Sequence, residues 1–202
     1  RFDASPFACR FAGEVKGFDI GDYIPEKEAR HMDRFIHLGL AAASQAVADS
    51  GLPTGEALDP ELALRIGCNI GSGIGGLPMI EQTQTELLNR GPRRISPFFV
   101  PASIINMISG HVSIRYGFKG PNSAVVPACT TGLHAIGLSV RMIEHGDADV
   151  MVAGGAEAQL EQGLVVVDVD PRSGGDDSMV DLRAKLGALP DTVEALTGGG
   201  GR

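Results

Sequence analysis

The sequence contains no tryptophan, and it contains no long uninterrupted run of apolar residues. A membrane-spanning helix needs about 18 or more such residues in a row, so we expect no transmembrane segment. The first residues, Arg1 to Pro6, lack the basic stretch followed by an apolar stretch that marks a secretory signal. These absences lead us to expect a cytoplasmic protein without a membrane partner.

Cysteine is scarce, with only Cys9, Cys68 and Cys129 in 202 residues. An odd number at wide spacing fits neither a disulfide framework nor a metal-binding motif, so reduced thiols are expected. Four acidic residues near the C-terminus lack the spacing of a calcium-binding loop and are interpreted as a solvated acidic loop. They are Asp168, Asp170, Asp176 and Asp177. No metal site is predicted.

Positive charge is in the minority, because 17 Lys and Arg stand against 25 Asp and Glu, for a net charge of −8. Nucleic acids and anionic membranes favour dense basic surfaces, so neither is expected as the main partner. One local exception is the group Arg90, Arg93 and Arg94, with Arg30 and Arg34 on an earlier predicted helix. These arginines form either a small basic patch or a solvated surface without function.

A hydrophobic content of 43% with 21% charged residues is typical of a folded domain. Apolar periodicity and turn residues predict alternating elements. Helices are expected over 26–50, 79–88, 101–114 and after Cys129, and strands over 62–70, 124–128, 149–155 and 163–168. This alternation predicts a layered α/β domain. Beyond Ala158 the pattern changes, with a turn or linker at 170–178, a short amphipathic stretch at 179–196 and a flexible glycine tail at 198–201.

Cys129 is the candidate nucleophile, because it lies where the strand predicted over 124–128 meets the start of a helix. Unpaired N–H groups and the positive end of the helix dipole stabilise a thiolate at such a position. A small buried core residue is the alternative, and it is the commoner role for a cysteine in an apolar run. His134, five residues later, is rotated by about 140° on an ideal helix and cannot readily reach the thiol. Sequence alone places no other histidine beside Cys129.

A glycine-rich segment, Gly71-Ser-Gly-Ile-Gly-Gly76, has the G-x-G-x-x-G spacing of a dinucleotide-binding turn. The acidic residue that would bind the ribose, about 20 residues further on, is absent. We therefore expect no nucleotide cofactor. The glycines are better explained by close approach of the backbone to another segment or to a narrow pocket.

Four ordered motifs resemble the β-ketoacyl-acyl carrier protein synthase II family. They are Gly71–Leu77, Gly91–Pro101, Ala128–Gly132 and Gly146–Glu157, and the resemblance extends over residues 2–157. It implies a thiolase-like fold and a decarboxylating Claisen condensation in fatty-acid elongation. Cys129 would accept the acyl group as a thioester, and the carbanion formed from malonyl-acyl carrier protein would attack that thioester.

The resemblance also implies roles for other residues. Ile74 and Phe99 match positions that line or gate the family's acyl pocket, with core packing as their alternative role. The basic residues would bind the acidic acyl carrier protein, and the set expected to do so is Arg34, Arg90, Arg93 and Arg94. The region 106–120 resembles the family's dimer interface, so a homodimer is expected. No cofactor is implied.

The chain departs from the family in two respects. The family's opening strand is absent, and so are the His-Gly-Thr, Lys-Ser-x-x-Gly-His and Gly-Phe-Gly-Gly motifs of its second half. We therefore expect an incomplete fold, with a partial ketosynthase domain at 1–158, a divergent segment at 159–202, and no complete catalysis by this chain alone. Three alternatives stay open: a thiolase-fold enzyme acting on coenzyme A esters, a non-catalytic partner subunit, which the presence of Cys129 disfavours, and a chain that does not fold stably.

Overall fold

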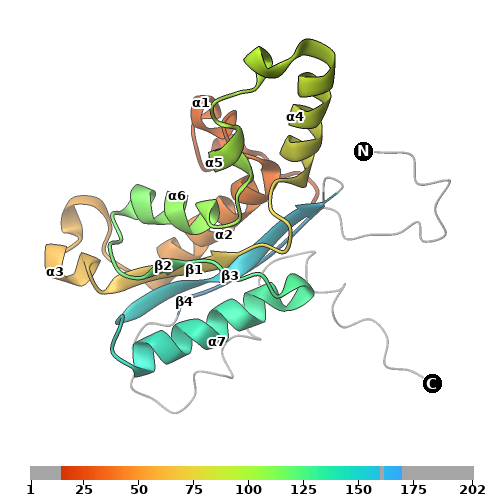
Figure 1. Ribbon diagram of the computed structural model, residues 1–202. Coiled ribbons are helices and arrows are strands. Elements are labelled where there is room, and N and C mark those ends of the chain that lie inside the picture. The colour runs from red at the N-terminus through yellow and green to blue at the C-terminus, as the bar shows by residue number, and fades with distance from the viewer. Residues whose placement is uncertain (1–14, 160–161, 170–202) are drawn as a thin grey trace. The chain divides into compact units, whose positions relative to one another are not determined.

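The computed structural model describes residues 15–159 and 162–169, with side chains up to residue 158. Its sheet has the strand order β2-β1-β3-β4. The strands are β1 (Ile66–Gly71), β2 (Asn122–Ser123), β3 (Val150–Gln159) and β4 (Gln162–Val169). β1 pairs in parallel with both β2 and β3, whereas β4 pairs antiparallel with β3. The carboxyl ends of β1, β2 and β3 therefore lie at one edge of the sheet (Figure 1).

Helices cover both faces of this sheet. α2 (Arg34–Ser50) and α6 (Met107–Tyr116) pack on one face, and α7 (Thr131–Glu144) packs on the other (Figure 1). The core between the layers is apolar and includes the fully buried Phe35, Ile36, Ile66, Ile108 and Val152. The layered α/β fold predicted from the sequence is confirmed. No helix in the described ranges is long and apolar enough to cross a membrane.

The helix expected over 26–50 is two helices, α1 (Glu26–Ala29) and α2. The break lies at Asp33, which has an extended backbone with φ −72° and ψ 161°. Its carboxylate accepts a hydrogen bond from the Phe35 N–H at 3.4 Å and so caps α2. At the other end, Gly51 has a left-handed φ of 70°, which confirms the predicted stop.

Two other predicted elements have different bounds in the structure. The helix expected over 101–114 is divided into α5 (Phe99–Ser103) and α6, because Ile104 is extended. The strand expected from residue 62 begins at Ile66, because Asp59 caps the short helix α3 (Pro60–Ala63). The helix predicted over 79–88 is confirmed as α4 (Leu77–Arg90). The part of the chain that the structure describes also contains four short 3₁₀ helices, η1 (Ile20–Asp22), η2 (Gly55–Ala57), η3 (Pro92–Arg94) and η4 (Ala128–Thr130).

The strand predicted over 124–128 is wrong. β2 ends at Ser123, and the chain then leaves the sheet, so that Val126 is 52% exposed. Pro127 has no N–H to donate to a ladder, and Ala128 has a φ of 52° that a strand does not allow. The segment instead crosses the end of β1, where the Val125 carbonyl lies against Gly71.

The later strands confirm the sequence pattern. The strand expected over 149–155 is β3, which extends to Gln159, and the one expected over 163–168 is β4. The linker, amphipathic stretch and glycine tail expected beyond residue 169 lie outside the described residues, and so does Cys9. The division at residue 158 stays a prediction.

Candidate active site

Cys129 lies in η4, between the carboxyl edge of the parallel strands and the start of α7, and its side chain is exposed. The residue before it, Ala128, is the one non-glycine residue with positive φ in the part of the chain that the structure describes. Such backbone conformations are uncommon and often occur at functional sites. The prediction of a thiol at a turn before a helix is confirmed, although Cys129 lies within a short 3₁₀ helix and the residues before it are not a strand.

Two threonines fix the backbone of this turn. The Thr130 hydroxyl donates to the Pro127 carbonyl at 2.9 Å, and the Thr131 hydroxyl donates to the Ala128 carbonyl at 2.6 Å. Thr131 is buried, whereas Thr130 is exposed. The hydroxyls beside Cys129 therefore donate to backbone carbonyls, and these hydrogen bonds fix the turn on which the thiol lies.

Glycines bring the start of α7 onto the ends of the strands. A Cβ at Gly71 would lie 2.1 Å from the Val125 oxygen and 2.7 Å from Thr131 Cγ2, and a Cβ at Gly155 would lie 2.9 Å from the Gly132 nitrogen. Real Cβ atoms do not approach other atoms so closely. The expectation that glycine permits close backbone approach here is confirmed.

The glycine-rich segment 71–76 carries Ile74 to the cysteine turn. Glu157, near the end of β3, accepts hydrogen bonds from the N–H groups of Gly73 at 2.6 Å and Ile74 at 3.1 Å, both through Oε2. A Cβ at Gly73 would lie 3.6 Å from Ala128 Cα, so the segment passes directly beside the residue before Cys129. The Ile74 side chain is 48% exposed.

Phe99 begins α5 and is half-buried. Its carbonyl accepts a hydrogen bond from the Ser103 hydroxyl at 2.7 Å, and the Ser103 carbonyl accepts one from the Gly76 N–H at 3.0 Å. α5 is thereby attached to the same glycine-rich segment that holds Ile74. The structure connects both predicted acyl-pocket residues to this segment, and their contact with an acyl chain stays a prediction.

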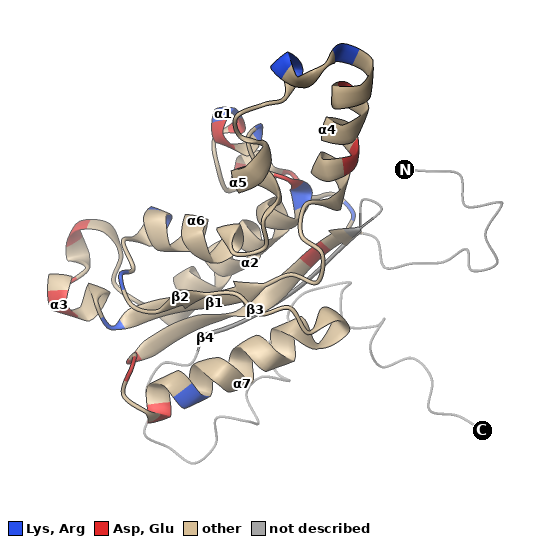
Figure 2. Cartoon of the chain, viewed as in Figure 1, with Lys and Arg blue, Asp and Glu red and all other residues tan. Residues whose placement is uncertain are grey.

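The predicted basic residues occupy two environments. Arg90 ends α4, and Arg93 and Arg94 lie in η3; all three are exposed. Figure 2 shows this basic group at the end of α4 and in the segment that follows it. Arg34 instead begins α2, lies half-buried with its guanidinium 5.6 Å from the centre of the Phe18 ring, and has a buried Nε without a hydrogen bond.

The histidines have local roles. His134 is exposed, and its Nδ1 lies 3.2 Å from the Thr130 carbonyl oxygen of its own helix. The His37 Nε2 lies 2.8 Å from the Ala29 carbonyl oxygen, and burial lowers the pKa of His37. His31 stacks on Phe98 with ring centroids 4.0 Å apart. Within residues 15–158 no histidine is hydrogen-bonded to Cys129.

Cys68, unlike Cys129, is shielded from solvent. It lies in the middle of β1, is fully buried, and burial raises the pKa of its thiol to about 12. A thiol in that environment is not a nucleophile. In the residues that the structure describes, no three His, Cys, Asp or Glu side chains are placed to hold a metal ion.

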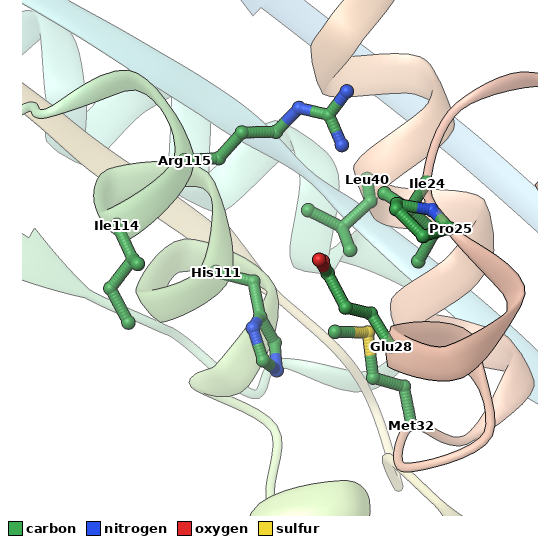
Figure 3. Close-up of a pocket in the computed structure, with 8 residues that line it drawn as sticks. All are labelled: Ile24, Pro25, Glu28, Met32, Leu40, His111, Ile114 and Arg115. Carbon is green, nitrogen blue, oxygen red and sulfur yellow. The ribbon is translucent and has the colours of Figure 1, made fainter.

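A cavity of about 360 Å³ lies between the α1–α2 segment and α6, apart from the predicted site residues (Figure 3). Glu28 and His111 line it together with apolar residues that include Leu40 and Met32. Burial lowers the pKa of His111, and the nearby Glu28 carboxylate partly opposes that effect. The cavity shares no lining residue with the cysteine turn.

Sequence reasoning missed Glu157, Thr131 and Asp33. Glu157 comes shortly after the apolar run predicted as a strand over 149–155, and a position at the carboxyl end of a strand was the available signal for a site residue. Asp33 precedes an apolar-periodic segment, which is a helix-start signal. Its second carboxylate oxygen accepts the Met79 N–H at 2.9 Å and attaches the start of α4 to α2. Burial raises the pKa of Asp33.

Comparisons with known proteins agree with this geometry. Residues 7–168 match the family model of the β-ketoacyl synthase N-terminal domain, which ends ten residues beyond the boundary expected at 158. The chain is 58% identical over 156 residues to 3-oxoacyl-[acyl-carrier-protein] synthase 2 of Vibrio cholerae, covering 77% of the chain and 37% of that protein. The corresponding protein of Coxiella burnetii is 53% identical over 157 residues, and this match covers 78% of the chain and 37% of that protein.

Solved structures show the same fold. A type II PKS ketosynthase in complex with its acyl-carrier protein, bound to the hexaketide, gives a TM-score of 0.65 at 29% identity and covers 71% of the chain and 40% of that structure's chain. A β-ketoacyl synthase from Burkholderia phymatum gives 0.59 at 27% identity, covering 71% and 35%. The chain thus spans well under half the length of these proteins, and the fold is thiolase-like. From the family match and the shared fold together, the chain belongs to the β-ketoacyl synthase family.

Proposed function

We propose that this chain carries the acyl-accepting nucleophile of a 3-oxoacyl-acyl carrier protein synthase, and that this nucleophile is Cys129. The observation that carries the proposal is an exposed thiol on a fixed turn at the carboxyl edge of the parallel strands, directly before α7. Ligands of open α/β sheets bind at that edge, and helix starts favour anions.

The chemistry proceeds in two steps. The Cys129 thiolate attacks the carbonyl carbon of an acyl thioester on the carrier, and the carrier's thiol leaves, so the acyl group becomes bound to the enzyme. Malonyl-carrier protein then loses CO₂, and the resulting carbanion attacks the acyl-cysteine and releases the Cys129 thiolate. The Thr130 and Thr131 N–H groups already donate to the Pro127 and Ala128 carbonyls, so the N–H of Cys129 itself is the group proposed to stabilise the oxyanion of the first step.

Acyl carrier protein is the proposed partner, and Arg90, Arg93 and Arg94 are its proposed contact surface, with Arg34 as a further contact. Three exposed arginines within five residues, of which Arg90 also pairs with Glu86 at 3.4 Å, favour an acidic partner at this surface on a chain of net charge −8. The related ketosynthase solved with its acyl-carrier protein supports the choice of partner.

Ile74 and Phe99 are the proposed acyl-pocket residues, because an alkyl chain requires apolar contacts and the segment holding Ile74 passes beside the cysteine turn. A homodimer is also proposed. Its support is that, among the described strands, β2 is paired with β1 alone, and that Ile114 of α6, within the expected interface 106–120, is 77% exposed. An edge strand with apolar neighbours is a common site of association. The cytoplasmic location stays a prediction.

The test is to incubate the chain with an acyl carrier protein that bears a saturated acyl group and to map the modified peptide by mass spectrometry. We expect the acyl mass on the Cys129 peptide and none in the Cys129→Ser variant. Condensation with malonyl-carrier protein is not expected from this chain alone, because it contains none of the family's second-half histidine motifs. Acyl transfer to a different residue, or no transfer to a cooperatively folded sample, would contradict the proposal. Faster transfer from acyl-coenzyme A would favour the thiolase-type alternative.

A further inference from the structure

Glu157 holds the glycine-rich segment by its backbone. One carboxylate oxygen, Oε2, accepts both the Gly73 N–H at 2.6 Å and the Ile74 N–H at 3.1 Å. Hydrogen bonds to an ionised carboxylate are shorter and stronger than those between neutral groups. The other oxygen, Oε1, is buried and has no hydrogen-bond partner. Only one of the two carboxylate oxygens of Glu157 is therefore hydrogen-bonded to the segment.

The space around Gly73 is too small for a side chain. A Cβ at Gly73 would lie 2.7 Å from Glu157 Oε2, and the next residue it would meet is Ala128, whose Cα would be 3.6 Å away. Gly73 is thus enclosed by the carboxylate on one side and by the residue before Cys129 on the other. Glu157, Gly73 and Ala128 form one packed contact between the end of β3, the glycine-rich segment and the cysteine turn.

Ile74 depends on this contact for its position. Its side chain is 48% exposed, so core packing does not fix it. The end of the segment is fixed separately, because the Gly76 N–H donates to the Ser103 carbonyl at 3.0 Å and the Met79 N–H donates to Asp33 at 2.9 Å. Glu157 is the charged group that fixes the part beside Cys129.

We propose that Glu157 is a positioning residue that sets the acyl-chain selectivity of Cys129 by fixing the backbone of Ile74. The inference rests on the proposed function, in which Ile74 lines the acyl pocket. A long acyl chain on Cys129 must pass the Ile74 side chain, whereas a short chain need not. Loss of the carboxylate therefore changes the reaction of long chains more than that of short ones.

The experiment compares Glu157→Ala and Glu157→Gln with the wild-type chain, and uses Glu144→Ala, an exposed acid at the far end of α7, as the matched control. The probes are the butyryl and dodecanoyl thioesters of N-acetylcysteamine, and the readout is the rate of Cys129 acylation measured by mass spectrometry. Glu157→Ala should change the ratio of the long-chain to the short-chain rate by about tenfold, the effect of losing a hydrogen bond to a charged acceptor.

Two controls separate positioning from general damage. The rate at which iodoacetamide alkylates Cys129 in Glu157→Ala should stay within about twofold of the wild-type rate, because this small reagent does not pass Ile74. Glu157→Gln should restore part of the wild-type ratio, because its amide oxygen can accept the same N–H groups. An unchanged acylation ratio in Glu157→Ala, with wild-type acylation intact, would overturn the inference.

A double-mutant cycle tests the contact itself. Gly73→Ala alone places a Cβ 2.7 Å from the carboxylate and should disturb the segment. In the Glu157→Ala background the same Cβ meets only Ala128 Cα at 3.6 Å, an ordinary contact. Gly73→Ala should therefore change the ratio of long-chain to short-chain acylation rates less in the Glu157→Ala background than in the wild-type chain. Additive changes in this ratio would contradict the proposed contact.

Amide hydrogen exchange separates this inference from the proposed function. The Gly73 and Ile74 amides should exchange at least about tenfold faster in Glu157→Ala than in wild type, because they lose their acceptor. If wild-type Cys129 accepts no acyl group, the proposed function fails, and exchange still decides whether Glu157 fixes the segment. Unchanged exchange would overturn the positioning role whatever the acylation result.

Discussion

Cys68 and Cys129 have the same side chain and both are free thiols, yet they lie in opposite environments. Cys68 is in the middle of β1, where helices cover both faces of the sheet, and burial raises the pKa of its thiol to about 12. Cys129 lies where the chain has left the sheet, on an exposed turn. The difference is one of backbone path, because Cys68 continues the β1 ladder whereas the chain leaves the sheet before Cys129.

That path has identifiable causes. β2 pairs with β1 only through Asn122 and Ser123, and the chain then crosses the end of β1 beside Gly71. Pro127 and Ala128 cannot extend a ladder, and η4 follows. Packing thus determines stability in the β1 region, and turn geometry determines reactivity at Cys129. Each of the following predictions tests this separation.

The largest expected effect is in thiol labelling. In the folded chain near neutral pH, iodoacetamide should alkylate Cys129 at least about 10³-fold faster than Cys68, because the Cys68 thiolate is scarce and reaction requires local opening. The rates are measured on the two cysteine peptides by mass spectrometry. Labelling in strong denaturant is the control and should bring the two rates together. Equal rates in the folded chain would contradict the comparison.

The next effect is on stability where the turn and the core meet. Gly71→Ala should lower the free energy of unfolding by about 1–3 kcal/mol, because its Cβ would overlap the Val125 carbonyl, a backbone group that cannot easily move. Chemical denaturation monitored by circular dichroism measures the change.

Gly137→Ala is the matched control for that substitution. Gly137 lies within α7 and has open space around its Cβ position, so alanine should stabilise the chain by about 0.5–1 kcal/mol. If both substitutions changed the free energy of unfolding by the same amount and in the same direction, close backbone approach at Gly71 would not be the cause of the destabilisation.

The fold could be predicted from the sequence where one segment carries its own signal. The buried run that became β3, the helix α4 and the stop at Gly51 all follow from local patterns. The breaks at Asp33 and Ile104 were missed because apolar periodicity continues across them. The strand predicted over 124–128 was wrong because an apolar, partly β-branched run has the pattern of a strand, while its exit from the sheet depends on a contact with Gly71, more than fifty residues earlier.

The candidate site divides in the same way. Cys129 was predicted from its place before a helix, and Ile74 from the resemblance of short ordered motifs to a known family. Glu157 was not, because its partner Gly73 is 84 residues away in the sequence. Thr131 was not singled out either, since a threonine at a helix start has many ordinary roles. A residue that acts by holding another segment has no local signature, and only the fold reveals its partner.

A smaller effect is expected within the turn. Thr131→Val should cost about 1 kcal/mol of unfolding free energy, because the buried hydroxyl that donates to the Ala128 carbonyl is lost while the shape is kept. Thr130→Val removes a similar hydrogen bond at an exposed position and should cost less. Thermal unfolding and the Cys129 labelling rate are measured on both variants. If Thr130→Val lowered the free energy of unfolding more than Thr131→Val, the assignment of Thr131 as the main support of the turn would be contradicted.

The smallest effect is the pH dependence of stability, which belongs to the packed region. Burial lowers the folded-state pKa of His37 and His111, so the unfolded chain binds more protons just below the ordinary histidine value of 6.5. Stability is therefore complete above pH 6.5 and decreases as the pH falls through the window beneath it. Burial raises the pKa of Asp33 above 3.8, which acts in the opposite direction at lower pH.

We expect a slope of roughly a few tenths of a kcal/mol per pH unit just below pH 6.5, under the limit of about 1.4 kcal/mol for one fully linked proton. His37→Gln should flatten this slope, because an amide can still donate to the Ala29 carbonyl but takes up no proton. Cys129→Ser should leave the slope unchanged, since His37 is hydrogen-bonded to Ala29 and His111 faces Glu28, both away from the turn. Urea unfolding at several pH values measures all three chains. A slope that changes with Cys129 and not with His37 would show that the turn and the packed region are coupled.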